Sequence, residues 1–122
     1  MTVKDIMEIR GIFAKRKHAV YSVSLGLKIV RFLKKTEDVE AFYLARQEKI
    51  FEECLEKDEN GAYIPASGGY KLRADKIEEY QKKLLELHGE RTEDTVSFSE
   101  EDAEALKLSV EELRIVSEFL EV

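Results

Sequence analysis

The sequence predicts a mainly α-helical fold with one small β-hairpin. Charged residues make up 38% of the 122 residues, the chain contains one proline and six glycines, and apolar residues recur at helical spacing through most of it. In order, we expect a long helix, a hairpin, an antiparallel returning helix and short C-terminal helices. A chain of this length indicates a single domain, residues 1–122, whose modest core would gain stability from oligomerisation.

The first helix is predicted within residues 1–18. Thr2 is the expected N-cap, and Asp5 completes a capping box three residues later. The cations of residues 15–18 end the helix, because positive side chains favour the negative end of a helix dipole. The apolar residues that we expect to face the core recur at spacings of three and four: Val3, Ile6, Ile9 and Phe13.

The main element is a long helix over residues 23–57, capped by Ser22 or Ser24. It lacks proline, and strong helix formers fill its second half. The pattern fits one continuous helix or two nearly collinear helices with a kink at residues 36–38. One helix of this length would span roughly 50 Å, so part of it should pack against another helix of this chain or of a second copy. The expected inward residues are Val23, Leu27, Val30, Ala41, Leu44, Phe51 and Leu55.

A turn and a two-stranded hairpin are predicted for residues 58–72. The segment begins with Asp-Glu-Asn-Gly, residues that tolerate positive φ, and two strand-like pieces follow at residues 62–65 and 70–72. Pro65 restricts the hairpin to a sheet edge, so it must rest on a helix to persist. Residues 95–98 alternate polar and apolar side chains, and this pattern is compatible with one further short strand.

The returning helix is predicted over residues 73–88, antiparallel to the later part of the long helix, with Gly89 as its C-cap. Its apolar seam consists of Ile77, Tyr80, Leu84 and Leu87.

The C-terminal part, residues 92–122, should hold two short helices. Ser99 with Asp102 starts the first, and Ser109 with Glu112 forms a clear capping box for the second. The expected inward residues of the last helix are Val110, Leu113, Val116 and Leu120.

Charge is distributed unevenly along the chain. Residues 1–35 carry a net charge of +7 and residues 36–122 a net charge of −13, and residues 92–122 alone contain ten acids and two bases. The overall charge of −6 argues against general nucleic-acid binding, which depends on neutralising phosphates. It leaves room for a local anion site at the basic end, or for self-association of a basic end with an acidic end.

The composition also predicts where the protein is located. No run of 18 apolar residues occurs, and charged residues interrupt the N-terminal segment, so we expect neither a membrane span nor a signal peptide. Cys54 is the only cysteine, so it forms no internal disulfide and is predicted to be a buried small apolar residue. We therefore expect a cytoplasmic protein, with a reactive thiol at Cys54 as the less favoured alternative.

Motifs for catalysis, metals and cofactors are missing from the sequence. His18, Cys54 and His88 are far apart, and neither HExxH nor CxxC occurs. The glycine-rich segment at residues 67–69 fits a turn better than a phosphate-binding loop. Paired acids, which we interpret as solvated helix faces, occur at Glu52–Glu53, Glu78–Glu79, Glu100–Glu101 and Glu111–Glu112. The prediction is a non-enzyme with no catalytic residues, no metal site and no cofactor.

Two sets of residues remain as candidate binding sites. The first would bind phosphates, with a tyrosine to stack on a base, if the first helix folds back beside the second: Lys15, Arg16, Lys17, Tyr21, Lys28, Arg31 and Lys35. The second is a candidate protein interface: Tyr63, Ile64, Tyr70, Glu100, Glu101 and Glu104. The simpler alternatives are a solvated basic face for the first set, and packing of the hairpin aromatics on their parent helices for the second.

Six short phrases of the sequence stand in a distinctive order. They are Glu40–Ala41–Phe42, Ala45–Arg46–Gln47, Glu56–Lys57–Asp58–Glu59–Asn60–Gly61, Tyr70–Lys71–Leu72, Leu84–Leu85–Glu86–Leu87 and Leu108–Ser109–Val110–Glu111–Glu112–Leu113. Over about residues 20–120 they resemble a family of small proteins of unknown function encoded by phages and prophages, mostly of Gram-positive bacteria. The resemblance implies a phage origin and a role in a bacterial cytoplasm or in virion assembly. It implies no catalytic residues, because the family has no established activity. The helix–hairpin–helix outline is also similar to prefoldin-type proteins, in architecture alone.

These observations favour a self-associating protein, a dimer or larger oligomer, that acts by binding. One hypothesis is an accessory protein that binds a phage or host protein, in virion assembly or as an inhibitor of a host defence protein. Its acidic residues 92–122 would then mimic nucleic acid or meet a basic partner. The alternative is a sponge that sequesters a small phosphorylated nucleotide signal in a basic pocket between protomers. Charge reversal at Arg31 would abolish binding by the sponge, whereas reversal among Glu100, Glu101 and Glu104 would matter more to the accessory protein.

Overall fold

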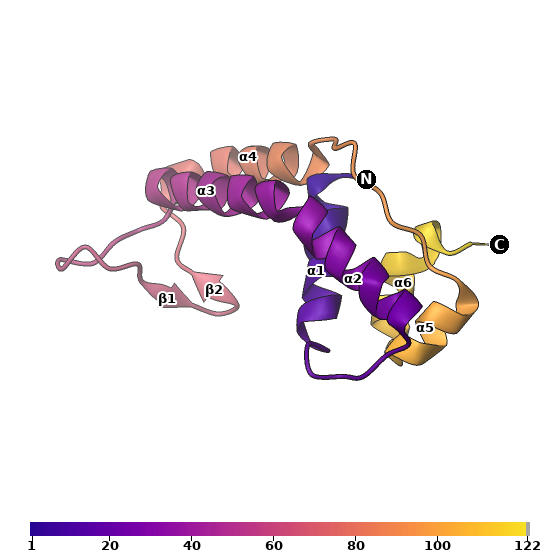
Figure 1. Cartoon of the computed structure of the whole chain (residues 1–122). Coiled ribbons are helices and arrows are strands. Elements are labelled where there is room, and N and C mark those ends of the chain that lie inside the picture. Colours follow the sequence, from indigo (N-terminus) through magenta and orange to yellow (C-terminus); the bar gives the residue numbers. More distant parts are fainter. Residues whose placement is uncertain (122) are drawn as a thin grey trace.

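The computed structural model describes residues 1–121 and confirms the mainly helical fold with one small antiparallel hairpin (Figure 1). In chain order the elements are α1 (Val3–Ala14), α2 (Val23–Lys35), α3 (Glu37–Cys54), β1 (Pro65–Ala66), β2 (Gly69–Tyr70), the 3₁₀ turn η1 (Ala74–Lys76), α4 (Ile77–Gly89), α5 (Glu100–Leu106), α6 (Val110–Val116) and the 3₁₀ turn η2 (Ser117–Phe119). The helices α3 and α4 lie side by side and, with the hairpin that joins them, extend away from the other helices (Figure 1). We call residues 37–89 the arm, and α1, α2 and residues 92–121 the body.

The helix α1 lies at the centre of the body. Its predicted capping box is present: Thr2 Oγ1 accepts from the Asp5 amide at 3.2 Å, and the Thr2 amide donates to Asp5 Oδ2 at 2.9 Å. Its predicted apolar stripe is buried, which confirms the expected core face. The helix ends at Ala14, and turns follow it, so it is shorter than the predicted range. The buried core of the body consists of Ile6, Ile9, Ile12, Phe13, Leu25, Phe32, Phe98, Leu106 and Val116.

The predicted long helix is two helices that meet at Thr36. The axes of α2 and α3 point in clearly different directions, so the expectation of near collinearity is wrong (Figure 1). Thr36 is fully buried, and its hydroxyl donates to the Phe32 carbonyl at 2.8 Å and accepts from Arg10 Nη1 at 2.7 Å. The second helix ends at Cys54, three residues earlier than predicted.

The predicted inward face of these two helices is largely wrong. The three residues expected to face inward from α2, Val23, Leu27 and Val30, are exposed, and so are two of those expected from α3, Ala41 and Leu44. Of the remaining two, Leu55 is buried and Phe51 is partly buried. The helix α2 instead buries Leu25 and Phe32. The error has a physical reason: α2 carries apolar residues on two opposite faces, and only contact with other elements decides which face is covered.

The arm has a small apolar cluster of its own between α3 and α4. Ile50, Cys54 and Leu87 are buried there, and Tyr43, Leu72 and Tyr80 pack against them. The antiparallel returning helix is thus confirmed, although within its predicted seam Ile77 is exposed. Cys54 is fully buried, as predicted, and burial raises the pKa of its thiol.

The prediction that Gly89 caps α4 is wrong. Gly89 is the last residue of the helix and does not adopt the left-handed conformation that favours glycine at a C-cap. The chain continues from Glu90 in an extended conformation, and the Glu90 carbonyl accepts from the Val3 amide at 2.8 Å. The end of α4 is therefore set by pairing with the start of α1.

The hairpin and the C-terminal part depart from prediction in detail. Each named strand has only two residues, and the segment that follows α3 pairs with both arms of the hairpin through bridges between Lys57 and Tyr63 and between Leu55 and Leu72. Phe98 forms a parallel bridge with Leu120 and does not extend the hairpin.

Both C-terminal capping boxes, at Ser99 and Ser109, are confirmed. Val116 is buried as expected, and Leu120 is partly buried but lies beyond α6 and η2, whereas Val110 and Leu113 are exposed. No helix within residues 1–121 is both long enough and apolar enough to cross a bilayer.

Candidate functional site

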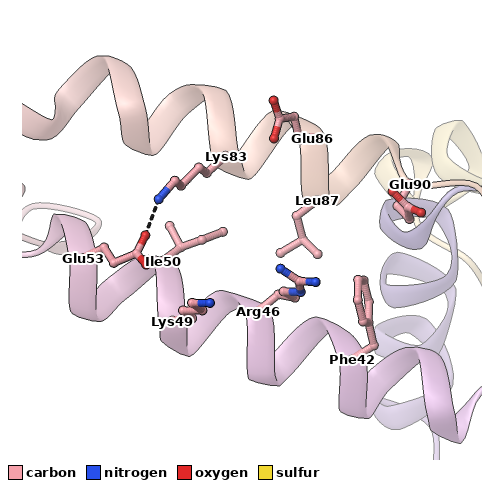
Figure 2. A pocket seen from close by; sticks show the side chains of 9 residues that line it. All are labelled: Phe42, Arg46, Lys49, Ile50, Glu53, Lys83, Glu86, Leu87 and Glu90. Carbon is pink, nitrogen blue, oxygen red and sulfur yellow. Dashed lines mark hydrogen bonds and ion pairs between the residues drawn. The ribbon is translucent and has the colours of Figure 1, made fainter.

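The strongest candidate site is a groove of about 420 Å³ between α3 and α4 (Figure 2). Its lining residues from α3 lie three or four positions apart except for the neighbours Lys49 and Ile50, and those from α4 do so except for the neighbours Glu86 and Leu87, so each set forms one edge of its helix. They are Phe42, Arg46, Lys49, Ile50 and Glu53 from α3, Lys83, Glu86 and Leu87 from α4, and Glu90 directly after it.

The floor of the groove is apolar because it is the edge of the arm's own cluster. Ile50 and Leu87 belong to that cluster and are buried, whereas Phe42 is exposed at the end nearest the body. The guanidinium carbon of Arg46 lies 5.4 Å from the centre of the Phe42 ring, a cation–π contact that holds the two side chains together.

The two walls of the groove carry opposite charge. Arg46 and Lys49 come from α3, and Glu86 and Glu90 come from α4 or its end. Within residues 1–121 none of these four side chains takes part in an ion pair of 4 Å or less. The charges on both walls are therefore available to a partner.

The far end of the groove is closed by an ion-pair network. Lys83 Nζ pairs with Glu53 and lies 3.0 Å from Glu79 Oε1, and Lys76 Nζ lies 2.9 Å from Glu79 Oε2. The hydrogen bond to Glu53 raises the pKa of Lys83, and hydrogen bonds from Lys76 and Lys83 lower the pKa of Glu79 to about 2. Both shifts favour the charged forms, so this network stays ionised across the physiological pH range.

The predicted basic ligand site is not gathered in one place. Arg16 Nη1 and Nη2 donate to the Glu112 carboxylate at 2.7 and 2.5 Å, and Arg16 Nε donates to the Leu106 carbonyl at 2.6 Å. Lys28 lies elsewhere, against α5, where its Nζ donates to Asp102 Oδ2 at 2.6 Å. Two of the seven predicted residues are thus used inside the fold.

The remaining residues of that set divide between different surfaces. Lys15, Arg16 and Tyr21 line a recess of about 610 Å³, together with Lys107, which the sequence reasoning missed. Lys17 lines the adjoining groove between α1 and α2, which Arg16 and Tyr21 also line. Arg31 and Lys35 are exposed on α2 and line neither of these spaces.

The predicted protein interface is also divided. The ring centres of Tyr63 and Tyr70 lie 6.4 and 6.3 Å from that of Phe51, so both tyrosines pack on their parent helix, and Ile64 is partly buried nearby. The acidic residues Glu100, Glu101 and Glu104 are exposed on α5, at the opposite end of the molecule from the hairpin (Figure 1). The two halves of this set therefore do not form one continuous surface.

The sequence reasoning missed the groove residues themselves. Phe42, Arg46, Lys49 and Glu53 do recur at helical spacing, but that signal identifies a groove edge only when the packed face of α3 is known.

Within residues 1–121 there is no group of three His, Cys, Asp or Glu side chains placed to hold a metal ion. No protein-family model, curated protein or solved structure matches the chain.

Proposed function

We propose that this chain is a non-enzymatic accessory protein of a phage or prophage that acts by binding another protein. The phage origin rests on the family resemblance of residues 20–120, and the binding role rests on the groove between α3 and α4. Virion assembly and inhibition of a host defence protein are the two settings in which such a protein would act.

The observation that carries the proposal is the opposite charge of the two groove walls above an apolar floor. An anion is attracted by Arg46 and Lys49 but repelled by Glu86 and Glu90. A cation is attracted by the two glutamates but repelled by the arginine and the lysine. A segment of protein carries both signs of charge together with apolar side chains, so it complements both walls and the floor at once.

The ionisation of the nearby groups supports binding over acid–base chemistry. A general acid or base needs a carboxyl pKa raised toward neutrality or an amine pKa lowered toward it. The hydrogen bonds among Lys76, Glu79 and Lys83 shift both kinds of group in the other direction. Fixed charges of this kind serve to orient a partner.

Charge reversal within the groove tests the proposal. The tagged wild-type chain, the groove variant Lys49→Glu and the control Lys82→Glu would be used to recover proteins from a lysate of phage-carrying bacteria. Lys82 is exposed on α4 outside the groove, so the control makes the same charge change elsewhere. We expect the wild type and the control to retain the same partner, and Lys49→Glu to weaken its binding by about tenfold, as measured with the purified partner. Equal binding by all three proteins would contradict the proposal.

A second candidate function has one supporting observation. The recess that holds Lys15, Tyr21 and Lys107 combines two exposed cations with an aromatic ring, as a nucleotide sponge requires. Native mass spectrometry of the same preparations separates the two functions. If a bound small molecule is lost in Lys107→Glu and retained in Lys49→Glu, ligand sequestration would replace protein binding as the proposed function.

A further inference from the structure

The helix α2 presents a second apolar face that this chain leaves uncovered. Val23, Leu27 and Val30 are 79%, 44% and 48% exposed, and their spacing of four and three places them on one side of the helix. The opposite side is buried in the core of the body through Leu25 and Phe32. A helix that packs against its own protein on one side needs only one apolar stripe. A second apolar stripe on the exposed side therefore indicates a surface for a further contact.

This stripe borders a concave groove of about 590 Å³ between α1 and α2. Val30 belongs to both, and the α1 side of the groove includes Met7, Gly11 and Ala14, at spacings of four and three, together with Arg10 and Phe13. At Gly11 and at Gly26 of α2, no atom beyond the adjacent residues and the nearby backbone of the same helix lies within 4 Å of the position that a Cβ would occupy. The space between the two helices is therefore open to a further element, and we call the stripe and the groove together the α1–α2 surface.

The charge of α2 is unusual for this chain, although Glu40 of α3, which is paired with Arg10, also lines the groove. Among the α-helices of residues 1–121, α2 alone contains no Asp or Glu, although the protein carries a net charge of −6. Arg31 and Lys34 follow Leu27 and Val30 by four residues and continue the stripe. Both cations are exposed, and neither has an ion-pair partner within the described part of the chain. The C-terminal end of a helix favours cations, which accounts for the charges of Arg31 and Lys34 but does not account for the exposed apolar residues beside them.

We infer that the α1–α2 surface binds an acidic amphipathic helix of a partner protein. The apolar face of such a helix would lie in the groove and against the stripe, and acidic residues along its flank would pair with Arg31 and Lys34. This surface is separate from the groove of Figure 2, because no residue lines both. The inference therefore goes beyond the proposed function and gives the chain a second binding surface.

Two other occupants fit the surface less well. A second copy that docked through its own α2 would bring two sets of unpaired cations together, which opposes association. A lipid surface is flat and would leave the concave groove unfilled, and the stripe lacks the bulky aromatic residues typical of interfacial helices.

The test uses the full chain and a fluorescently labelled model peptide of about 18 residues, long enough to form a helix. Its apolar face carries leucines at helical spacing and its flanks carry glutamates, and a matched peptide carries lysines instead. Fluorescence anisotropy should show that the acidic peptide binds at least about tenfold more tightly than the basic one. Val30→Asp should weaken binding about tenfold, whereas Leu85→Asp, at an exposed apolar residue of α4, should leave it unchanged.

Charge-reversed Arg31→Glu/Lys34→Glu should reverse the preference between the two peptides, with circular dichroism confirming that each variant remains folded. Equal binding of both peptides, or binding of neither, would overturn the inference. If the protein sediments with anionic phospholipid vesicles and Val30→Asp abolishes this, the surface would be assigned to a membrane instead. If light scattering shows a dimer and the same variant is a monomer, the surface would be assigned to a second copy.

Discussion

At the scale of single residues, the basic N-terminal part is joined to the acidic C-terminal part by two similar ion pairs. Glu112 and Asp102 each complete the capping box of a C-terminal helix, and each also receives a cation from the N-terminal third of the chain, Arg16 and Lys28 respectively. The uneven distribution of charge along the chain suggests binding of an external anion or of a second copy. Part of that charge is instead paired within one molecule. Each pair orients a helix N-terminus and fastens it to the N-terminal part of the chain.

The pair between Arg16 and Glu112 predicts a specific pH dependence. Its hydrogen bond lowers the pKa of the Glu112 carboxyl from 4.5 to about 2 in the folded protein. The charged carboxylate therefore stabilises the fold above about pH 4.5, and this contribution is lost as the pH falls toward about 2. Glu112→Gln should lower the free energy of unfolding by about 3 kcal/mol near neutral pH, because it leaves the partly buried Arg16 without its charged partner.

Urea denaturation at a series of pH values measures both effects. The variant should lose less stability than the wild type between neutral pH and about pH 3, so the two curves converge. Glu118→Gln, at an exposed glutamate of the same region, is the control and should follow the wild type. Parallel curves for Glu112→Gln and the wild type would show that this carboxylate does not control acid stability.

At the scale of elements, the boundary between α2 and α3 depends on a contact from a third helix. Arg10 of α1 donates through Nη1 to the Leu33 carbonyl at 2.8 Å and to the Thr36 hydroxyl at 2.7 Å, and its Nε lies 3.0 Å from Glu40 Oε2. A helix end leaves carbonyl groups without partners, and Arg10 supplies a donor to one of them, the Leu33 carbonyl. The kink is therefore built by packing against α1.

Thr36→Val tests this account of the kink. The substitution keeps the volume of the buried side chain but removes the hydroxyl that bonds to both Phe32 and Arg10. We expect the free energy of unfolding to fall by about 2 kcal/mol, because two hydrogen bonds are lost in a buried place. Thermal denaturation by circular dichroism measures the change, and Thr95→Val, at an exposed threonine, should have no effect. If the two variants proved equally stable, the polar contacts at Thr36 would not be what holds the boundary.

At the scale of the whole molecule, the body and the arm have cores of very different size. The core of the body has nine buried apolar residues, whereas the cluster of the arm has three, and the hairpin strands beyond it are exposed. Local stability follows the amount of buried apolar contact, so the arm should open more readily than the body. A separable arm also suits a binding element, because its groove can adjust without unfolding the body.

Hydrogen exchange after matched core truncations tests this difference. Ile50→Ala in the arm should speed amide exchange in α3 and α4 while leaving α1 protected. Ile9→Ala in the body should lower the stability of the whole chain by about 3 kcal/mol and speed exchange everywhere. Mass spectrometry of peptic fragments resolves the elements. Uniform loss of protection in both variants would mean that body and arm unfold as one unit.

The sequence by itself determined the features that depend on neighbours a few residues away. The capping boxes at Thr2, Ser99 and Ser109 are formed by residues three positions apart, so they are present wherever those helices form. The buried face of α1 was equally predictable, because Val3, Ile6, Ile9 and Phe13 recur at spacings of three and four on one side of the helix. The order of helices, hairpin and returning helix follows from turn residues and periodicity alone.

Only the tertiary structure decided which of these surfaces are covered. Arg16 and Glu112 are 96 positions apart in the chain, so their pairing cannot be read from local spacing, and the same holds for the contact of Arg10 with Thr36. The choice between the two apolar faces of α2, and the groove between α3 and α4, likewise depend on how distant elements pack. Local hydrogen bonds and periodicity specify where helices form, whereas burial and charge pairing depend on partners that only the folded chain brings within reach.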